Sequence, residues 1–390
     1  MSAEGPFDLL VVGAGIVGLA HALAGVRRGW RVAVVERDAR CVGASVRNFG
    51  FVTVSGQGAQ AWPRARRSRE VWAELAPAAG IAVLQQGAWI SARRPAAVAV
   101  LEQFAASAQG QGCTLLSGAD ARRQAPVLAA DTQAVLCSPH ELRVESRSAL
   151  PRLAAWLQQA HGVAFFWGEE VLAVEPPAVR TARRWLQAER VVLCTGAALG
   201  GVAAPWLDAH GLGLTRLQML RLRPPAGAVL PAPVLGDLSL VRYGGFAAQP
   251  AAAALRQALE REAGDCLAHG VHVIVVQSAD GSWVVGDSHH ADDAAAPFGA
   301  FEERGLFAAD AAPASEAVDG LILRELRALL DLGEPAATTV VERWIGHYPV
   351  GHSEDALVLQ PGDALRVVLV TSGTGASTGF ALAEEVLAGW

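Results

Sequence analysis

The glycine-rich segment Gly13–Gly18 constrains the fold of this chain more than any other feature. It follows an apolar run, Phe7–Val12, which predicts a buried strand, and it opens a helix predicted over Ile16–Arg28. A second predicted strand, Arg31–Val35, leads directly into Glu36. Glycines allow a tight turn, the helix N-terminus offers N–H groups to a pyrophosphate, and an acid at this place can bind ribose hydroxyls. The sequence therefore predicts a dinucleotide-binding β-α-β unit.

The basic residues of the chain are all arginines. Lys and Arg total 32, and no lysine occurs. This excludes a pyridoxal-phosphate Schiff base and a P-loop lysine. The formal charge of −6 argues against a surface that coats nucleic acid, so we expect no nucleic-acid partner. A length of 390 residues with 52% hydrophobic residues allows two or three domains and a sizeable core.

The cysteines and the apolar N-terminal stretch indicate the cellular compartment of the protein. The cysteines are odd in number and form no C-x-x-C pair, which favours a reducing cytoplasm over a disulfide framework or a zinc finger. The stretch Leu9–Val26 has the apolar character of a signal peptide or a membrane span. However, Glu4 and Asp8 precede it instead of basic residues, and glycines interrupt it. We expect a buried strand and helix here, no membrane span, and a cytoplasmic protein.

Apolar patterns predict further elements along the chain. Helices are predicted near Ser68–Leu75, Ser148–His161, Leu321–Leu332 and Ala381–Leu387, and strands at Val163–Phe166, Val171–Val174, Arg190–Leu193, Arg216–Leu222, His272–Gln277, Trp283–Asp287 and Leu365–Thr371. Asp280-Gly281 predicts a hairpin between two of these strands. The stretch 80–141 carries weak signals. The chain begins and ends with similar strand-turn-helix patterns, which indicates a nucleotide-binding domain built from separated segments with a second sheet domain inserted.

Three further segments indicate which dinucleotide is bound, because the glycine motif alone does not separate FAD from NAD. They are Gly43–Phe51, Val191–Gly196 and Ser372–Gly379. Together with the β-α-β unit they resemble the flavin-binding segments of the D-amino-acid oxidase superfamily, on the branch of glycine oxidase and sarcosine oxidase. In that family the last turn points a helix N-terminus at the pyrimidine edge of the flavin, where it stabilises the anionic reduced form. The resemblance covers nearly the whole chain.

A closer resemblance is to a bacterial subgroup associated with aminophosphonate catabolism. It is carried by Ser45–Phe51, Gly286–His289 and Glu342–Tyr348. The resemblance implies an α/β fold with a Rossmann-like FAD-binding domain and an inserted substrate domain on a large mixed, mostly antiparallel sheet. The ranges expected are 1–82, 142–214 and 340–390 for the FAD-binding domain, and 83–141 and 215–339 for the substrate domain.

The resemblance also implies the residues that contact FAD. These are Gly13, Gly15, Ile16, Val17, Glu36, Arg37, Ser45, Arg47, Asn48, Gly50, Phe51, Val171, Thr195, Gly196, Gly346, Gly373, Gly375, Ala376, Ser377 and Thr378. Gly346 lies nearest the place where sarcosine-oxidase-like enzymes carry a cysteine bonded to the flavin. A non-covalent FAD is therefore predicted.

The predicted substrate side departs from the family pattern at Tyr348. It occupies the place where glycine-oxidase-like enzymes carry an arginine for the substrate carboxylate, so a simple α-amino carboxylate is not expected. A phosphonate needs arginines or several N–H and O–H donors. The candidates are Arg47, Arg242, Tyr243, Tyr348 and Thr374, with Arg221 and Arg223 more typical of salt bridges.

Two adjacent histidines, His289 and His290, follow the Gly286-Asp287-Ser288 segment. Sarcosine-oxidase-like enzymes carry a substrate-contacting histidine after a similar strand. Neighbouring residues of a strand point to opposite faces, so only one of the two can face the flavin, and we select His289. No H-x-H or H-x-x-x-H spacing adds a metal ligand to this pair, so no metal is expected. No residue is assigned as a certain catalytic group.

These patterns lead to a functional hypothesis. The resemblance implies FAD-dependent oxidation of a small amine, with hydride transfer to flavin N5 and hydrolysis of the imine to an aldehyde. The expected substrate is 2-aminoethylphosphonate or its N-methyl form, which gives phosphonoacetaldehyde, and the expected acceptor is oxygen or another electron acceptor. Alternatives are a glycine- or sarcosine-type amino-acid oxidase, or a non-catalytic FAD-binding subunit of a larger dehydrogenase. Some relatives use a lysine to promote oxygen reduction, and this chain has none.

Overall fold

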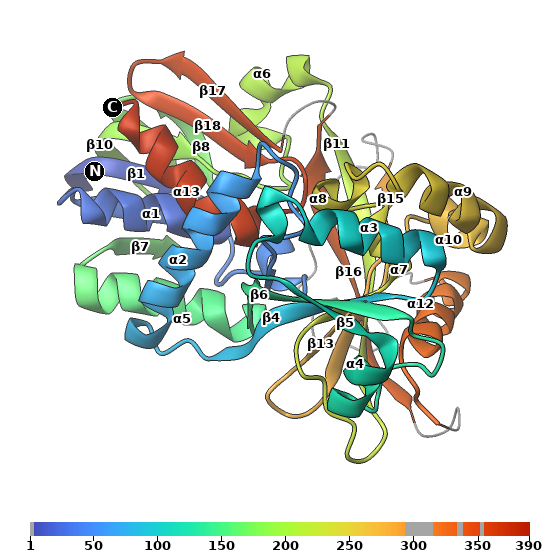
Figure 1. The fold of residues 1–390 in the computed structure, drawn as a ribbon. Coiled ribbons are helices and arrows are strands. Elements are labelled where there is room, and N and C mark those ends of the chain that lie inside the picture. The colour runs from blue at the N-terminus through green and yellow to red at the C-terminus, as the bar shows by residue number, and fades with distance from the viewer. Residues whose placement is uncertain (1–3, 293–314, 334–337, 352–354) are drawn as a thin grey trace.

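The computed structural model describes residues 4–292, 315–333, 338–351 and 355–390. These residues form two large β-sheets with helices packed against them (Figure 1). The first sheet, at the left of Figure 1, contains the N-terminal strand of the described chain, and the C-terminal helix packs beside it. This arrangement matches the sequence-based expectation that the first and last segments build one unit.

The first sheet has eight strands in the order β17-β18-β10-β1-β2-β7, with the β8–β9 hairpin attached to β10. The bounds are β1 Glu4–Val12, β2 Val32–Glu36, β7 Ala164–Trp167, β8 Val171–Glu175, β9 Ala178–Thr181, β10 Trp185–Leu193, β17 Ala356–Gly362 and β18 Leu365–Val370. Strands β18, β10, β1, β2 and β7 run parallel to one another, while β17 and β9 pair antiparallel with β18 and β10. Parallel strands buried on both faces read as continuous apolar runs, which is why they were recognisable in the sequence.

Four helices cover one face of this sheet (Figure 1). They are α1 Ile16–Arg27, α2 Trp62–Ala78, α5 Ser146–His161 and α13 Gly375–Ala388. The opposite face carries the β8–β9 hairpin and the short helices η3 Gly201–Ala203, α6 Ala204–Leu207 and η4 Asp208–His210. The apolar stretch Leu9–Val26 thus becomes β1 and α1, buried in the core. None of the helices in the described residues is both long and apolar enough to cross a membrane.

The second sheet has ten strands and is antiparallel at every pairing except β12–β4. Its strands are β3 Phe51–Val52, β4 Val83–Ala92, β5 Thr114–Ser117, β6 Ala134–Val144, β11 Gly213–Arg223, β12 Val234–Leu235, β13 Ile274–Gln277, β14 Trp283–Gly286, β15 His290–Asp292 and β16 Thr339–Val350. The predicted hairpin is present as β13–β14, and Gly281 in its turn has a φ of +81°. The long pair β11–β16 forms one side of this sheet.

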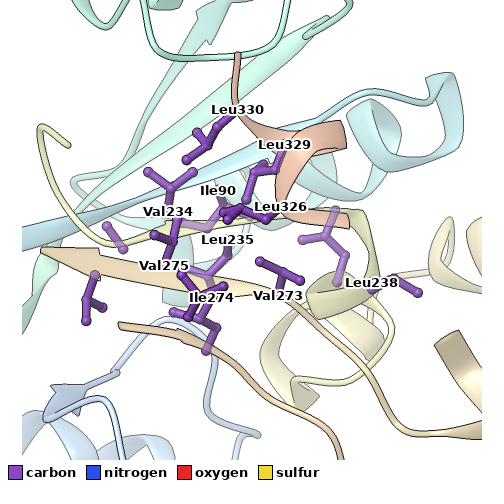
Figure 2. Close-up of a cluster of buried hydrophobic side chains, with 14 of the residues drawn as sticks. Ile90, Val234, Leu235, Leu238, Val273, Ile274, Val275, Leu326, Leu329 and Leu330 are labelled. Carbon is purple, nitrogen blue, oxygen red and sulfur yellow. The ribbon is translucent and has the colours of Figure 1, made fainter. Parts of the chain in front are cut away.

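Helices pack around the second sheet and close its core. They are η2 Ala108–Gly110, α3 Pro95–Ala105, α4 Gly118–Gln124, α7 Asp237–Leu240, α8 Gly244–Ala247, α9 Ala252–Glu262, α10 Gly264–Ala268 and α12 Glu316–Leu329. The short helix η1 Ala44–Val46 packs instead with the core of the first sheet. Figure 2 shows Leu326 and Leu329 of α12 beside Val234, Leu235 and other apolar side chains of the sheet. The stretch 80–141, which gave weak signals, folds into strands and helices of this unit.

The predicted α/β fold with a Rossmann-like unit and a mostly antiparallel second sheet is confirmed. Two strands pair differently from the expected division of the chain. Both β3 and β16 belong to the second sheet, although they lie almost wholly within the ranges expected for the FAD-binding domain. Strand pairing alone does not define a domain, so the domain ranges stay a prediction.

Candidate active site

A cavity of about 760 Å³ is lined by residues from both sheets. Its walls come from the loop after β1, the η1 segment, the turn between β18 and α13, and strands β11 and β16. The segments around residues 242–244 and 272–289 close it on the side of the second sheet. The cavity therefore joins the predicted nucleotide motif to the predicted substrate side.

The nucleotide end is shaped by the turn between β1 and α1. Gly13 has a φ of +103°, and a Cβ there would overlap the carbonyl oxygen of Cys194, so only glycine fits. The N–H of Ala14 donates to Glu36 Oε2 at 2.7 Å, and the N–H of Ile16 donates to Ser45 Oγ at 2.9 Å. Burial raises the pKa of Glu36. The carboxylate keeps lone pairs beyond these bonds, as expected of a ribose partner.

A second helix N-terminus meets the first at the cavity wall. The turn Ser372–Thr374 leads into α13, and a Cβ on Gly375 would lie 3.2 Å from the Ile16 side chain. Ser377 Oγ accepts the N–H of Thr53 at 3.0 Å, which ties α13 to the segment after β3. Two positive helix ends beside one cavity suit a ligand with phosphates and an anionic ring edge.

Most residues predicted to contact the cofactor line this cavity: Gly15, Ile16, Val17, Ser45, Arg47, Asn48, Phe51, Gly196, Gly346, Gly373, Gly375, Ala376 and Ser377. Outside the lining lie Gly13, Glu36, Arg37, Gly50, Val171, Thr195 and Thr378. Among these, Arg37 is half exposed beside Asp38, and Thr378 Oγ1 donates to the carbonyl of Thr374. Thr195 Oγ1 is buried without a hydrogen-bond partner in the described residues. All these contacts remain predictions.

Arg47 connects the η1 segment to β16. Its Nε donates to the carbonyl of Val42 and its Nη1 to the carbonyl of Ile345, both at 2.8 Å. Trp344 Nε1 donates to the Arg47 carbonyl at 3.0 Å. Burial, together with the charge of Arg147, lowers the pKa of Arg47 to about 10. These bonds show that Arg47 holds η1 against β16. Its contacts with cofactor and substrate are predicted in addition.

The two tyrosines of the chain both line the substrate side of the cavity. Tyr348 lies against the turn before α13, since a Cβ on Gly373 would be 2.9 Å from its Cζ. Burial raises the pKa of its phenol above the ordinary range, while the nearby charge of Arg242 lowers it by less. Tyr243 packs edge-on against His272, with ring centres 5.4 Å apart. The structure thus brings together four predicted residues: Arg242, Tyr243, Tyr348 and His289.

The other predicted polar residues are placed differently. Arg221 lies near Glu145 and Glu342, with N–O distances of 3.7 and 3.4 Å, which agrees with the expected salt bridge. Thr374 lines the cavity, and its Oγ1 is 2.7 Å from Ser372 Oγ. The ring of His290 packs near that of His269, with centres 5.2 Å apart, while His289 lines the cavity.

Sequence reasoning missed the two neighbours of His289. The carboxylate of Asp287 lies between two imidazoles: Oδ1 is 3.3 Å from His272 Nε2, and Oδ2 is 3.8 Å from His289 Nε2. Asp287 and His272 are each 4% exposed. Burial raises the pKa of Asp287 to about 7 and lowers that of His289 to about 3, and the pKa of His272 is also well below its usual value.

Backbone hydrogen bonds beyond the β13–β14 ladder bring this cluster together. The N–H of His272 donates to the carbonyl of Asp287 at 3.2 Å, and the N–H of His289 donates to the carbonyl of His269 at 3.0 Å. A search for metal-ligand spacings in the sequence could not find the contact, because His272 is distant from Asp287 along the chain.

The same three residues must be considered as a cation site, since their ligand atoms lie within 4.8 Å of one another. Zinc–ligand bonds of about 2.0–2.1 Å place neighbouring tetrahedral ligand atoms roughly 3.4 Å apart. The 3.8 Å between His289 Nε2 and Asp287 Oδ2 is longer than this. We therefore assign no metal ligands, and the absence of a metal stays a prediction.

Comparison with known proteins identifies the family. Residues 8–388 match the family model described as FAD dependent oxidoreductase. The fold is similar to that of glycine oxidase from Bacillus cereus (TM-score 0.73, 16% identity, 98% of this chain and 96% of that chain covered). It is also similar to L-proline dehydrogenase from P. horikoshii (TM-score 0.75, 16% identity, 99% and 93% covered) and to an FAD-bound L-α-glycerophosphate oxidase from Mycoplasma pneumoniae (TM-score 0.73, 14% identity, 99% and 96% covered).

A search of curated proteins gave no match. The family match spans nearly the whole chain, so the protein belongs to the FAD dependent oxidoreductase family and is an enzyme that uses FAD. The tight turn at Gly13, the two helix N-termini and the buried Thr195 hydroxyl fit this cofactor. Among the cysteines, Cys194 lines the cavity, and burial raises the pKa of its thiol. Non-covalent attachment of FAD stays a prediction.

Proposed function

We propose that this enzyme oxidises a small amine that carries a phosphonate, such as 2-aminoethylphosphonate or its N-methyl form, to phosphonoacetaldehyde. The bound FAD supplies the hydride acceptor, and oxygen is the proposed final electron acceptor, which yields hydrogen peroxide. Water hydrolyses the imine product to the aldehyde. The chain's own residues bind and orient the amine and exclude water around it.

The observation that carries this proposal is the set of donors around Arg242. Its guanidinium is exposed in the cavity and, within the described residues, forms no ion pair with a carboxylate. Tyr348 lies beside it, and Tyr243 and Thr374 line the same cavity. One arginine with several hydroxyl donors suits a phosphonate, whose three oxygens accept more hydrogen bonds than a carboxylate does.

The second candidate is a glycine- or sarcosine-type amino-acid oxidase. It is favoured by the same arginine, because a single guanidinium can also bind one carboxylate in a bidentate manner. The third is a non-catalytic FAD-binding subunit. The polar groups gathered on the substrate side of the cavity argue against it, and peroxide production by the isolated chain would exclude it.

The experiment is an anaerobic amine screen that follows the loss of the oxidised flavin absorbance. We expect 2-aminoethylphosphonate or its N-methyl form to bleach the flavin, and glycine, sarcosine and ethylamine to bleach it far more weakly. Bleaching by glycine or sarcosine with neither phosphonate active would overturn this substrate assignment in favour of the second candidate.

A variant separates the anion contact from the rest of the site. Arg242→Gln should weaken the apparent binding of the phosphonate amine about 10- to 100-fold, because a charge-assisted hydrogen bond contributes roughly 1.5–3 kcal/mol. It should lower the weak reaction with ethylamine much less. Tyr348→Phe is the matched neutral control and should show a smaller loss. Equal losses with ethylamine would show that Arg242 acts on the fold or the cofactor instead.

A further inference from the structure

We propose that Asp287, held between His272 and His289, accepts the proton that the substrate ammonium group loses before oxidation. This inference rests on the proposed amine oxidation and names the group that prepares its substrate. A protonated amine has no lone pair to assist hydride departure, so one proton must leave the nitrogen first. Asp287 is the buried carboxylate on the substrate side of the cavity wall.

The geometry places the carboxylate for this task. Asp287, His272 and His289 all line the cavity that also contains the cofactor motif. The two imidazole rings stack at 5.0 Å between centres with an interplanar angle of 25°. The His289 ring also meets Tyr348 edge-on, with centres 5.9 Å apart. Asp287 is thus confined by aromatic rings and open to the ligand only through the cavity.

The hydrogen bond of His289 to the backbone fixes which of its ring nitrogens carries a hydrogen, and so which atom faces Asp287. His289 Nδ1 lies 3.3 Å from the carbonyl of Gly270, which can only accept, so Nδ1 carries a hydrogen. In a neutral His289 ring, Nε2 is then a lone pair that faces the carboxylate oxygen of Asp287. Two acceptors cannot bond without a proton between them. One added proton on the carboxylate therefore removes the repulsion between these two acceptors.

The charged and titratable groups around Asp287 determine its pKa, and so the pH above which its carboxylate can accept a proton. Arg242, from the segment before α8, favours the carboxylate form, while burial disfavours it. The phenols of Tyr243 and Tyr348 stay neutral because burial raises their pKa. His290, on β15, and Arg242 both lower the pKa of His289. The balance leaves Asp287 with a pKa of about 7, so it is ionised in mildly alkaline solution and ready to accept.

The step itself is a simple proton transfer. One N–H bond of the substrate ammonium breaks, its electron pair stays on nitrogen, and an O–H bond forms on Asp287. The neutral amine and the neutral carboxylic acid then face each other. Asp287 and Arg242 together imply a substrate with a cationic end and an anionic end.

The test compares Asp287→Asn with Asp280→Asn, a matched change in the exposed turn of the same hairpin. The first measurement titrates the holoenzyme without substrate and follows the flavin absorbance from pH 5 to 9. We expect an inflection near pH 7 in the wild type and in D280N, and none in D287N. The same inflection in D287N would overturn the proposal.

The second measurement is anaerobic flavin reduction by the best amine of the screen, read as the rate divided by the apparent dissociation constant. In the wild type this ratio should rise to pH ~7.5 and then level off, because the enzyme takes the ammonium form. In D287N it should keep rising about tenfold per pH unit towards the amine pKa of ~10, because only the free base reacts. The variant should be at least 100-fold slower at pH 7.5.

The outcomes separate this inference from the proposed function. If no amine reduces the wild type, amine oxidation fails, while the titration still tests Asp287. If amines reduce the wild type and D287N keeps the levelling profile, the role of Asp287 is overturned. Should D287N fail to retain FAD, Asp287→Glu takes its place. It should keep both the inflection and the levelling profile, and loss of both in a folded, FAD-loaded D287E would contradict proton acceptance at this position.

Discussion

At the scale of single residues, a few polar side chains on one cavity wall carry the proposed chemistry. Both tyrosines of the chain are among them. The resemblance predicts Tyr348 at the place where related enzymes carry an arginine. Asp287 was visible in the sequence only as part of a motif. Its importance comes from the two rings packed beside it, which no local pattern encodes.

His21, in α1, gives a residue-scale prediction about acid stability. Its ring is fully buried, Nδ1 bonds to the Val17 carbonyl at 2.8 Å, and burial lowers its pKa to about 4. The unfolded chain takes up a proton near pH 6.5, before the folded chain does. Stability is therefore retained above pH 6.5 and lost as the pH falls towards 4, by about 3 kcal/mol in all.

His21→Leu should remove that part of the pH dependence. Urea unfolding of the holoenzyme at pH 7.5 and pH 4.5 measures it. The loss of unfolding free energy between the two pH values should be smaller in the variant by ~3 kcal/mol. An unchanged difference would mean that His21 stays neutral in both states or that another group dominates.

At the scale of elements, the β1–α1 turn carries the cofactor motif and tolerates no side chain at Gly13. Gly13→Ala should abolish FAD retention, because its Cβ would overlap the Cys194 carbonyl and the backbone would have to leave a φ of +103°. The flavin-to-protein absorbance ratio after purification measures this.

The matched control is Gly320→Ala in α12, where an added Cβ meets nothing within 4 Å. It should keep full FAD content and raise stability by about 0.5–1 kcal/mol, since alanine favours a helix interior. Full FAD content in G13A would show that the turn can rearrange and that the close approach to β10 is dispensable.

At the scale of the whole molecule, an ion-pair network joins α5, which packs on the first sheet, to the second sheet. Arg147 Nη1 lies 2.8 and 2.9 Å from the two carboxylate oxygens of Glu342, and Arg221 Nε is 3.4 Å from Oε2. The Arg147 guanidinium also lies 4.5 Å from the Trp344 ring centre. Glu342→Gln should cost about 2 kcal/mol of unfolding free energy, because the largely buried Arg147 loses its carboxylate partner and Arg221 keeps only Glu145 nearby.

Urea unfolding of the holoenzyme tests this, with Glu189→Gln as the exposed control. Glu189 pairs with Arg190 at the surface, its side chain is 63% exposed, and its loss should cost under ~0.5 kcal/mol. Similar losses in the two variants would show that the α5–β16 contact adds nothing to stability.

Local patterns were informative where the chain is regular. The parallel strands of the first sheet, strand β8 and helices α1, α5 and α13 could be predicted, since buried parallel strands and amphipathic or glycine-started helices leave a direct pattern. Strands β9 and β17, which pair antiparallel with their neighbours, were not predicted. The stretch 80–141 could not, because alanine and glutamine suit several structures and only pairing with other strands selects one. The placement of β16 in the second sheet likewise depends on its long pairing with β11, far away in the sequence.

The sequence by itself determined the cofactor unit, because the glycine turn, the helix it opens and Glu36 act within about 25 consecutive residues. It also determined which side chains are available, including the complete absence of lysine. The tertiary structure alone decided which side chains meet on the predicted substrate side. His272, Asp287 and His289 meet there across strand partners, and Tyr348 arrives from another strand. Side-chain encounters of this kind depend on sheet register and burial, and both arise only when distant segments pack together.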